Sequence, residues 1–159
     1  MAAGARGGDL PTPDETARLS GARVDEVRLE VPAESRFARV VRIAVSALAV
    51  RRGFDVSVVE DLRIAVDESL ILLLRAVQPV PAVGAPATGS DATSMVLTMS
   101  GGSDEVHVEL RVVPPPPVDP DDADARDALS RFAELVPPRV VVDDVDPVHG
   151  HVALLLTRI

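Results

Sequence analysis

The order in which hydrophobic periodicities follow one another constrains the fold of this chain more than any other feature. Residues 26–31 alternate between apolar and charged side chains, which predicts a half-buried strand, and two segments of helical spacing follow on either side of Gly53. Alternation returns in four later segments, at 95–99, 106–112, 139–142 and 151–159. A third helical segment, at 125–135, lies between the second and the third of them. The order β-α-α-β-β-α-β-β differs from the regular strand–helix alternation of a doubly wound parallel sheet.

These segments predict a single α+β domain. We expect a two-layer α/β sandwich in which a mixed, mainly antiparallel sheet of about five strands carries three helices on one face. The other face is left to solvent or to a second copy of the chain in a homodimer. The length of 159 residues suits one domain, at 23–159. Residues 1–22 are rich in Gly, Ala, Pro and charge and predict a disordered tail, and residues 78–92 predict a mobile loop.

Within the helical segments, apolar spacing predicts which sides are buried. Ser35 is a suitable N-cap for the first helix, and Ser57 with Glu60 fits a capping box for the second. The residues expected to face the core are Phe37, Val40, Val41, Ala44 and Leu48; Val58, Leu62, Ala65, Val66, Ser69, Leu70 and Leu73; and Ala125, Ala128, Leu129, Phe132 and Leu135.

The inventory of side chains excludes several functions. There is no Cys, so disulfides and thiolate metal sites are excluded, and all 16 basic residues are Arg, so a P-loop lysine is excluded too. The net charge of −9 disfavours binding to nucleic acid. No apolar stretch approaches the roughly 20 residues that span a membrane, and the N-terminal residues lack the apolar run of a secretion signal. We therefore expect a cytoplasmic protein that binds neither membranes nor nucleic acid.

One acidic residue of the second helix stands among apolar neighbours. The residues three and four positions from Glu68 are Ile64, Ala65, Ile71 and Leu72. One interpretation places Glu68 at the edge of the core with its carboxylate reaching water. The other makes it a partly desolvated general base. The adjacent Asp67 has Arg63 four residues before it, which predicts a weak, exposed ion pair.

The order of these segments, together with one motif in each of the first two helices, resembles the anti-sigma-factor/serine-kinase family. That family has the GHKL (histidine-kinase-like ATPase, or Bergerat) fold and controls stress and sporulation sigma factors. In that family an apolar strand leads into a helix that begins with a Phe-Ala-Arg-Val-like motif, here Phe37-Ala38-Arg39-Val40. A second helix carries an acidic N box, here Ala65-Val66-Asp67-Glu68. The resemblance is specific over residues 35–75 and extends over 24–159 by layout. The composition is similar to that of degenerate members from high-GC actinobacteria.

The resemblance implies roles for individual residues. Glu68 corresponds to the catalytic base of the family, whose kinases use ATP and Mg²⁺ to phosphorylate a serine of the anti-anti-sigma factor. Arg39 corresponds to the arginine on the surface that docks the sigma factor and the anti-anti-sigma factor, a STAS-type protein. Arg36 and Arg42 are further candidates for this surface. Without the resemblance, Arg39 is interpreted as a solvated helix arginine.

At the nucleotide-binding positions of the family, this chain departs from the pattern. Leu72 replaces the asparagine that holds Mg²⁺, and leucine offers no oxygen to a hard cation. Four prolines followed by Asp119 stand where the family has Asp-x-Gly-x-Gly. Gly150 matches the first residue of a late Gly-Thr pair, and His151 replaces the threonine. Because proline has no amide hydrogen to offer a phosphate, the resemblance implies a degenerate ATP site.

His149 and His151 form a His-x-His pair near the last strand. No cysteine and no fixed acidic third ligand accompany them in the sequence. We interpret them as ordinary surface histidines and predict no metal site.

Three hypotheses of function follow. The first is a transcription regulator of a stress response: an anti-sigma factor that sequesters an RNA polymerase sigma factor, is displaced by an anti-anti-sigma protein and has little or no ATP chemistry at its degenerate ATP site. The second is an active ATP–Mg²⁺-dependent serine kinase that phosphorylates the anti-anti-sigma protein, with Glu68 as its base. The third is a structural or dimerisation module unrelated to sigma factors.

Overall fold

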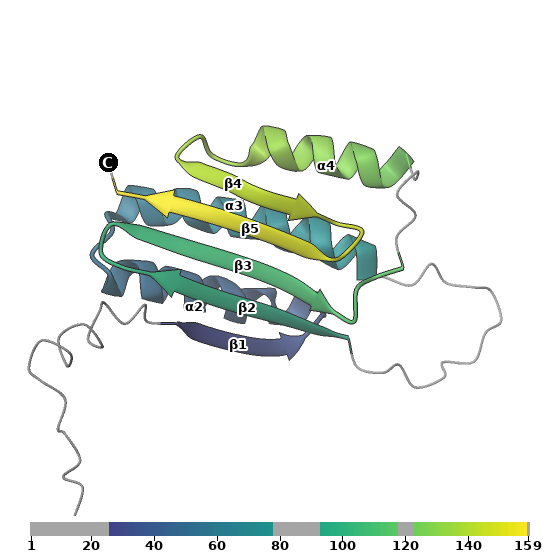
Figure 1. The fold of residues 1–159 in the computed structure, drawn as a ribbon, viewed down its shortest axis with the longest axis horizontal. Helices are drawn as coiled ribbons and strands as arrows, with labels where there is room; N and C mark the ends of the chain where they lie inside the picture. The colour runs from purple at the N-terminus through teal and green to yellow at the C-terminus, as the bar shows by residue number, and fades with distance from the viewer. Residues whose placement is uncertain (1–25, 78–92, 118–122, 159) are drawn as a thin grey trace, which may run out of the picture.

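The computed structural model of the chain describes residues 26–77, 93–117 and 123–158 (Figure 1). It confirms the predicted order of strands and helices and adds one 3-10 turn, η1. The elements are β1 (Val27–Pro32), η1 (Ser35–Phe37), α2 (Ala38–Arg51), α3 (Val56–Val77), β2 (Ser94–Gly101), β3 (Glu105–Val113), α4 (Ala123–Leu135), β4 (Val140–Asp146) and β5 (His151–Thr157). The predicted tail at 1–22 and the predicted loop at 78–92 lie outside the described residues.

The five strands form one open sheet in the order β1-β2-β3-β5-β4, and every neighbouring pair is antiparallel. The prediction of a mixed sheet is therefore wrong. After β3, helix α4 carries the chain to β4, which runs in the same direction as β3. Strand β5 then folds back between β3 and β4 and is antiparallel to both. This insertion removes the parallel pairing that a crossover helix usually creates.

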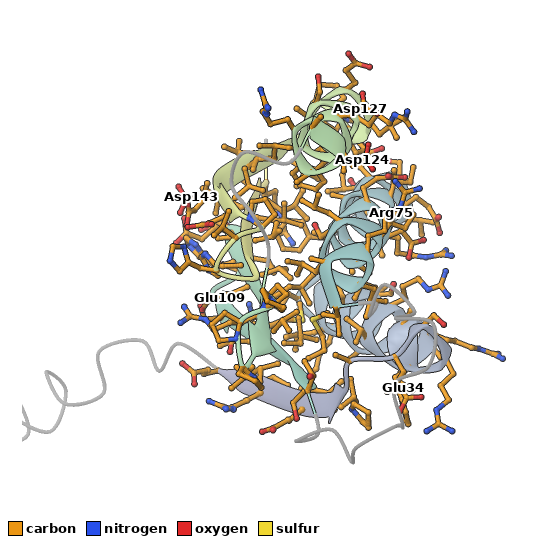
Figure 2. All side chains as sticks on the ribbon, turned by 90° about the vertical axis from the view of Figure 1, so that its right-hand side faces the viewer. Glu34, Arg75, Glu109, Asp124, Asp127 and Asp143 are labelled. Carbon is orange, nitrogen blue, oxygen red and sulfur yellow. The ribbon has the colours of Figure 1, made fainter. Side chains whose placement is uncertain are left out.

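All three helices pack on one face of the sheet, so the molecule has two layers (Figures 1 and 2). Alternate residues of each strand point between the layers, as the period of two requires. Buried Ser69 donates its hydroxyl to the carbonyl oxygen of Ala65 at 2.7 Å, so its burial leaves no unpaired group. The core is otherwise aliphatic apart from two Phe and two Met, and includes Val41, Val45, Ala49, Leu62, Leu73, Val106, Val108, Leu110, Val112, Val152, Leu154 and Leu156.

The helix boundaries differ from the predictions by a few residues. Ser35 begins the 3-10 turn, and α2 starts three residues later without a side-chain cap. Helix α3 starts before Ser57, because the backbone carbonyl of Asp55 already accepts hydrogen bonds from the amides of Val58 (3.0 Å) and Val59 (2.9 Å). A capping box that begins at Ser57 is therefore ruled out.

Two residues assigned to the core are exposed. Val40 in α2 and Leu135 at the end of α4 have 43% and 54% of their surface in solvent. Helix α2 turns Val41, Val45 and Ala49 inward instead. Within the described part of the chain, no helix combines the length and apolar character that a membrane span requires.

Candidate protein-binding surface

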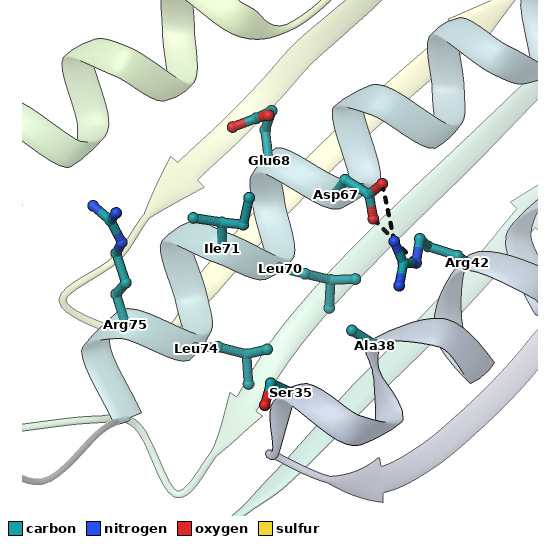
Figure 3. Close-up of a pocket in the computed structure, with 9 residues that line it drawn as sticks. All are labelled: Ser35, Ala38, Arg42, Asp67, Glu68, Leu70, Ile71, Leu74 and Arg75. Atoms are coloured by element: carbon teal, nitrogen blue, oxygen red, sulfur yellow. Dashed lines mark hydrogen bonds and ion pairs between the residues drawn. The ribbon is translucent and has the colours of Figure 1, made fainter.

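An open groove of about 500 Å³ lies between the start of α2 and the C-terminal half of α3 (Figure 3). Both helices line it, together with the 3-10 turn before α2. The groove brings together three residues that the sequence singled out, Arg42, Asp67 and Glu68, and places Arg75 beside them.

An ion pair joins the two helices in this groove. Nε of Arg42 lies 3.3 Å from Oδ1 of Asp67, and Nη1 donates to Oδ2 at 3.4 Å. Both side chains are about one-third exposed, so this pair contributes about 0.2–1 kcal/mol to stability. The predicted partner of Asp67 was wrong, because Arg63 binds Glu60 instead, with 2.6 Å between Nη1 and Oε1.

Glu68 points away from the Arg42–Asp67 pair (Figure 3). It is half-buried, and it has no hydrogen bond or ion pair with any residue that the structure describes. Its neighbours Ile64 and Ile71 are 44% and 49% exposed, so the apolar stripe around it lies on the outer surface of α3. This placement favours a carboxylate that reaches water over a desolvated base.

The three arginines predicted to bind a partner lie in different environments. Arg36 forms an ion pair with Glu34, with 2.8 Å between Nε and Oε2, and its guanidinium lies 4.9 Å from the ring centre of Phe37. Arg42 is held in the groove. Arg39 is exposed and has no hydrogen bond or ion pair within residues 26–77, 93–117 and 123–158. Its donors are therefore available to a partner.

A stripe of aliphatic side chains covers the outer side of α2. Val40, Ile43 and Val50 are 43%, 57% and 56% exposed, and Ala47 is exposed between them. Steps of three and four residues place all four on one side of the helix, and Arg39 borders them. We call these five residues the α2 face.

Sequence reasoning missed the α2 face because the opposite side of the same helix is aliphatic as well. One signal could have revealed it. Residues 35–54 contain five arginines and no acidic residue, in a chain whose net charge is −9. A positive segment in an acidic protein is an electrostatic feature that a partner can recognise.

The residues at the family's nucleotide positions do not fit ATP and Mg²⁺. Leu72 is 5% exposed and belongs to the core, so it offers no ligand to a cation. Gly150 has a positive φ of 66° and lies against the proline run. A Cβ at Gly150 would be 2.7 Å from Cδ of Pro116 and 3.0 Å from Cβ of Val112. Pro116 is buried there and has no amide hydrogen. Asp119 lies outside the described residues.

His151 lies on the sheet face away from the helices, so the structure separates it from the groove. Its ring bridges two carboxylates, with Nδ1 2.9 Å from Oδ2 of Asp144 and Nε2 3.0 Å from Oε1 of Glu109. Arg111 also binds Glu109, and its hydrogen bond is the main reason why the pKa of Glu109 lies below its ordinary value. Figure 2 shows Glu109 and Asp143 on this side of the molecule.

His149 has a different partner. It lies in the turn between β4 and β5, where its backbone amide donates to Oδ1 of Asp146 at 3.0 Å and its Nδ1 lies 2.6 Å from Oδ2. The backbone hydrogen bond is the main cause that lowers the pKa of Asp146. Among the described residues there is no group of His, Asp and Glu side chains arranged to hold a metal ion.

Comparison with known proteins adds no family to this description. No protein-family model matches the sequence, and no curated protein matches it. The resemblance is therefore carried by the two helical motifs and the order of elements.

Proposed function

We propose that this chain is an anti-sigma factor. It binds an RNA polymerase sigma factor through the α2 face, releases it when a STAS-type anti-anti-sigma protein takes the same surface, and performs no phosphoryl transfer. The finer assignment of the α+β fold to the GHKL type is part of the same proposal. It is supported by the order of elements, by the helices on one face, and by the Phe37–Val40 and Ala65–Glu68 motifs.

The exposure of the aliphatic α2 face is the observation that supports this proposal most directly. Single exposed aliphatic residues are common, but Val40, Ile43 and Val50 form a continuous stripe on one helix. Arg39 beside them has no partner within the described residues. An arginine next to an apolar patch that loses its water on binding is typical of the hot spots of protein interfaces.

The same face defines the chemistry of the partner. An amphipathic helix with aliphatic residues at helical spacing would cover the stripe, and its acidic residues would pair with Arg39. The negative charge of the rest of the chain disfavours other acidic surfaces and so restricts such a partner to α2. The family resemblance at Arg39 identifies this partner as the sigma factor.

Binding to a cognate sigma factor tests the proposal. Co-expression should give a stable complex, and calorimetry should show that Arg39→Glu weakens it at least about tenfold, since like charges then face each other. Ile43→Glu should weaken the complex to a similar extent, because it places an unpaired charge in an apolar contact.

Arg131→Glu is the matched control. Arg131 is an exposed arginine of α4, on the far side of α3 from α2, and it pairs with Asp127 at 2.8 Å. Its reversal should change affinity less than about twofold. The absence of a complex with any cognate sigma factor would overturn the proposal. A complex that neither α2 variant weakens would reject the α2 face, and α2-dependent self-association without sigma binding would favour a dimerisation module.

A further inference from the structure

A second hollow, of about 310 Å³, lies at the end of the molecule where α3 begins and β5 ends, on the left in Figure 1. Residues from three separate places in the sequence, 54–58, 139 and 157–158, line it. Phe54 and Asp55 come from the turn between α2 and α3, Ser57 from the first turn of α3, and Arg139 and Arg158 from the two ends of the last hairpin. Two guanidinium groups therefore line one small space in an acidic protein.

Arg158 is held in place from several sides. Its backbone amide donates to the carbonyl oxygen of Asp104 at 2.7 Å, and its Nη2 donates to the carbonyl oxygen of Arg52 at 2.9 Å. Its Cζ lies 5.0 Å from the ring centre of Phe54. A side chain at position 53 would crowd this group, because a Cβ at Gly53 would lie 3.2 Å from Nη2. A guanidinium has five donors, so the fixed group retains donors for a ligand.

Arg139 has a loose carboxylate partner. Its Nη1 lies 3.6 Å from Oδ2 of Asp61, beyond hydrogen-bond distance, and its side chain is 51% exposed. By comparison, Arg36 and Arg63 lie 2.8 Å and 2.6 Å from their carboxylates. The weak pair keeps Arg139 beside the hollow and leaves its donors free to bind a stronger acceptor.

We propose that this hollow binds an oxyanion: a phosphate group, either free or carried by a small phosphomonoester. Guanidinium groups match the oxygens of phosphate, and two of them from separate segments can bind one phosphate from two sides. Ser57 and Thr157 add hydroxyl donors. The start of α3 also favours negative charge, but the two arginines carry the argument. The site does not rest on the proposed binding of a sigma factor.

Asp55 allows the proposal to be tested by a substitution that should strengthen, not weaken, the binding of an anion. Among the residues that the structure describes, it is the one acidic residue that lines the hollow, and its charge opposes the binding of an anion. Its backbone carbonyl accepts the first hydrogen bonds of α3, and asparagine is as good an N-cap as aspartate. Asp55→Asn therefore removes the charge and preserves the start of the helix.

The experiment is an NMR titration of the full chain with inorganic phosphate, and in a second arm with O-phosphoserine, at constant ionic strength. Amide signals of Ser57, Val58 and Arg158 should shift and saturate below about 50 mM ligand, which corresponds to a millimolar or tighter site. Arg139→Gln should weaken binding about tenfold, and Asp55→Asn should tighten it about threefold. Saturation in the first arm alone identifies free phosphate as the ligand.

Arg131→Gln is the control for net charge, because it removes an exposed arginine of α4. It should leave phosphate affinity within about twofold. Three results would each overturn the proposal: no saturable shift with either ligand, equal losses from Arg139→Gln and Arg131→Gln, or weaker binding in Asp55→Asn. Circular dichroism of each variant shows that a loss of binding is not a loss of folding.

Discussion

Gly150 is the residue whose backbone the last hairpin depends on. Its φ of 66° is a conformation that side chains disfavour, and its carbonyl accepts a hydrogen bond from the amide of Val112 at 2.8 Å. Pro116 packs against the space where a Cβ would stand. The proline run and the turn before β5 therefore fix each other.

Replacing this glycine should be costly. Gly150→Ala adds a Cβ 2.7 Å from Pro116 and forces alanine into a positive φ, so we expect a loss of about 2–3 kcal/mol in unfolding free energy. Urea denaturation followed by circular dichroism measures it. Gly102→Ala is the control, because a Cβ there would lie more than 4 Å from every atom outside residues 101–103. Equal stability of the two variants would show that the packing around Gly150 is not tight.

At the scale of elements, β4 is an edge strand with an acidic outer side and a register shift between Val142 and Asp144. Besides its backbone pairing with β5, it is tied to the sheet by the contacts Asp144–His151–Glu109. Each ring nitrogen of His151 therefore lies within hydrogen-bond distance of a carboxylate oxygen. The bridge joins β3, β5 and β4 on the open face of the sheet.

The Glu109 carboxylate in this bridge should make the stability of the folded protein depend on pH. The hydrogen bond from Arg111 is the main cause that lowers the pKa of Glu109 from 4.5 in the folded state. The stabilisation is therefore complete above pH 4.5 and is lost as pH falls through the lower folded value. Glu109→Gln should destabilise the protein near neutral pH, and the difference from the unmodified chain should shrink below pH 4.5. Urea denaturation across this range measures it.

Glu105→Gln is the control for this prediction, because Glu105 is an exposed acid of the same strand that contacts His107 outside the bridge. It should change the unfolding free energy less than Glu109→Gln near neutral pH. A difference between Glu109→Gln and the unmodified chain that stays constant down to acid pH would contradict a role for the carboxylate charge.

The strands and helices also differ in how far the sequence predicts them. The strand predicted from the alternation at 106–112 is confirmed in β3, where the strict period of two turns Val106, Val108, Leu110 and Val112 to one buried side. Helix α2 was oriented incorrectly at Val40, since both of its sides are aliphatic and only packing selects between them. The contact of His151 with Glu109 spans 42 residues and depends on β5 lying between β3 and β4. No local pattern contains that information.

At the scale of the whole molecule, the two faces carry different chemistry. The helical side presents the aliphatic and arginine-bordered α2 face, and the open side of the sheet presents Glu109, Asp144 and the histidine between them. A protein of this kind can hold an acidic partner on one side while its own negative charge keeps other acidic surfaces away. This division suits a regulator that works by binding.

A measurement of ATP–Mg²⁺ binding can distinguish an anti-sigma factor that only binds its partners from an active serine kinase. Leu72 is buried without an oxygen to offer Mg²⁺, and Pro116 fills the space beside Gly150, so calorimetry with millimolar ATP–Mg²⁺ should detect no binding. Glu68→Gln should then leave binding to the sigma factor within about twofold, because Glu68 lies on α3 and is not part of the α2 face. Saturable ATP–Mg²⁺ binding, with transfer of phosphate to an anti-anti-sigma protein that Glu68→Gln abolishes, would establish a kinase instead and would reject a purely binding regulator.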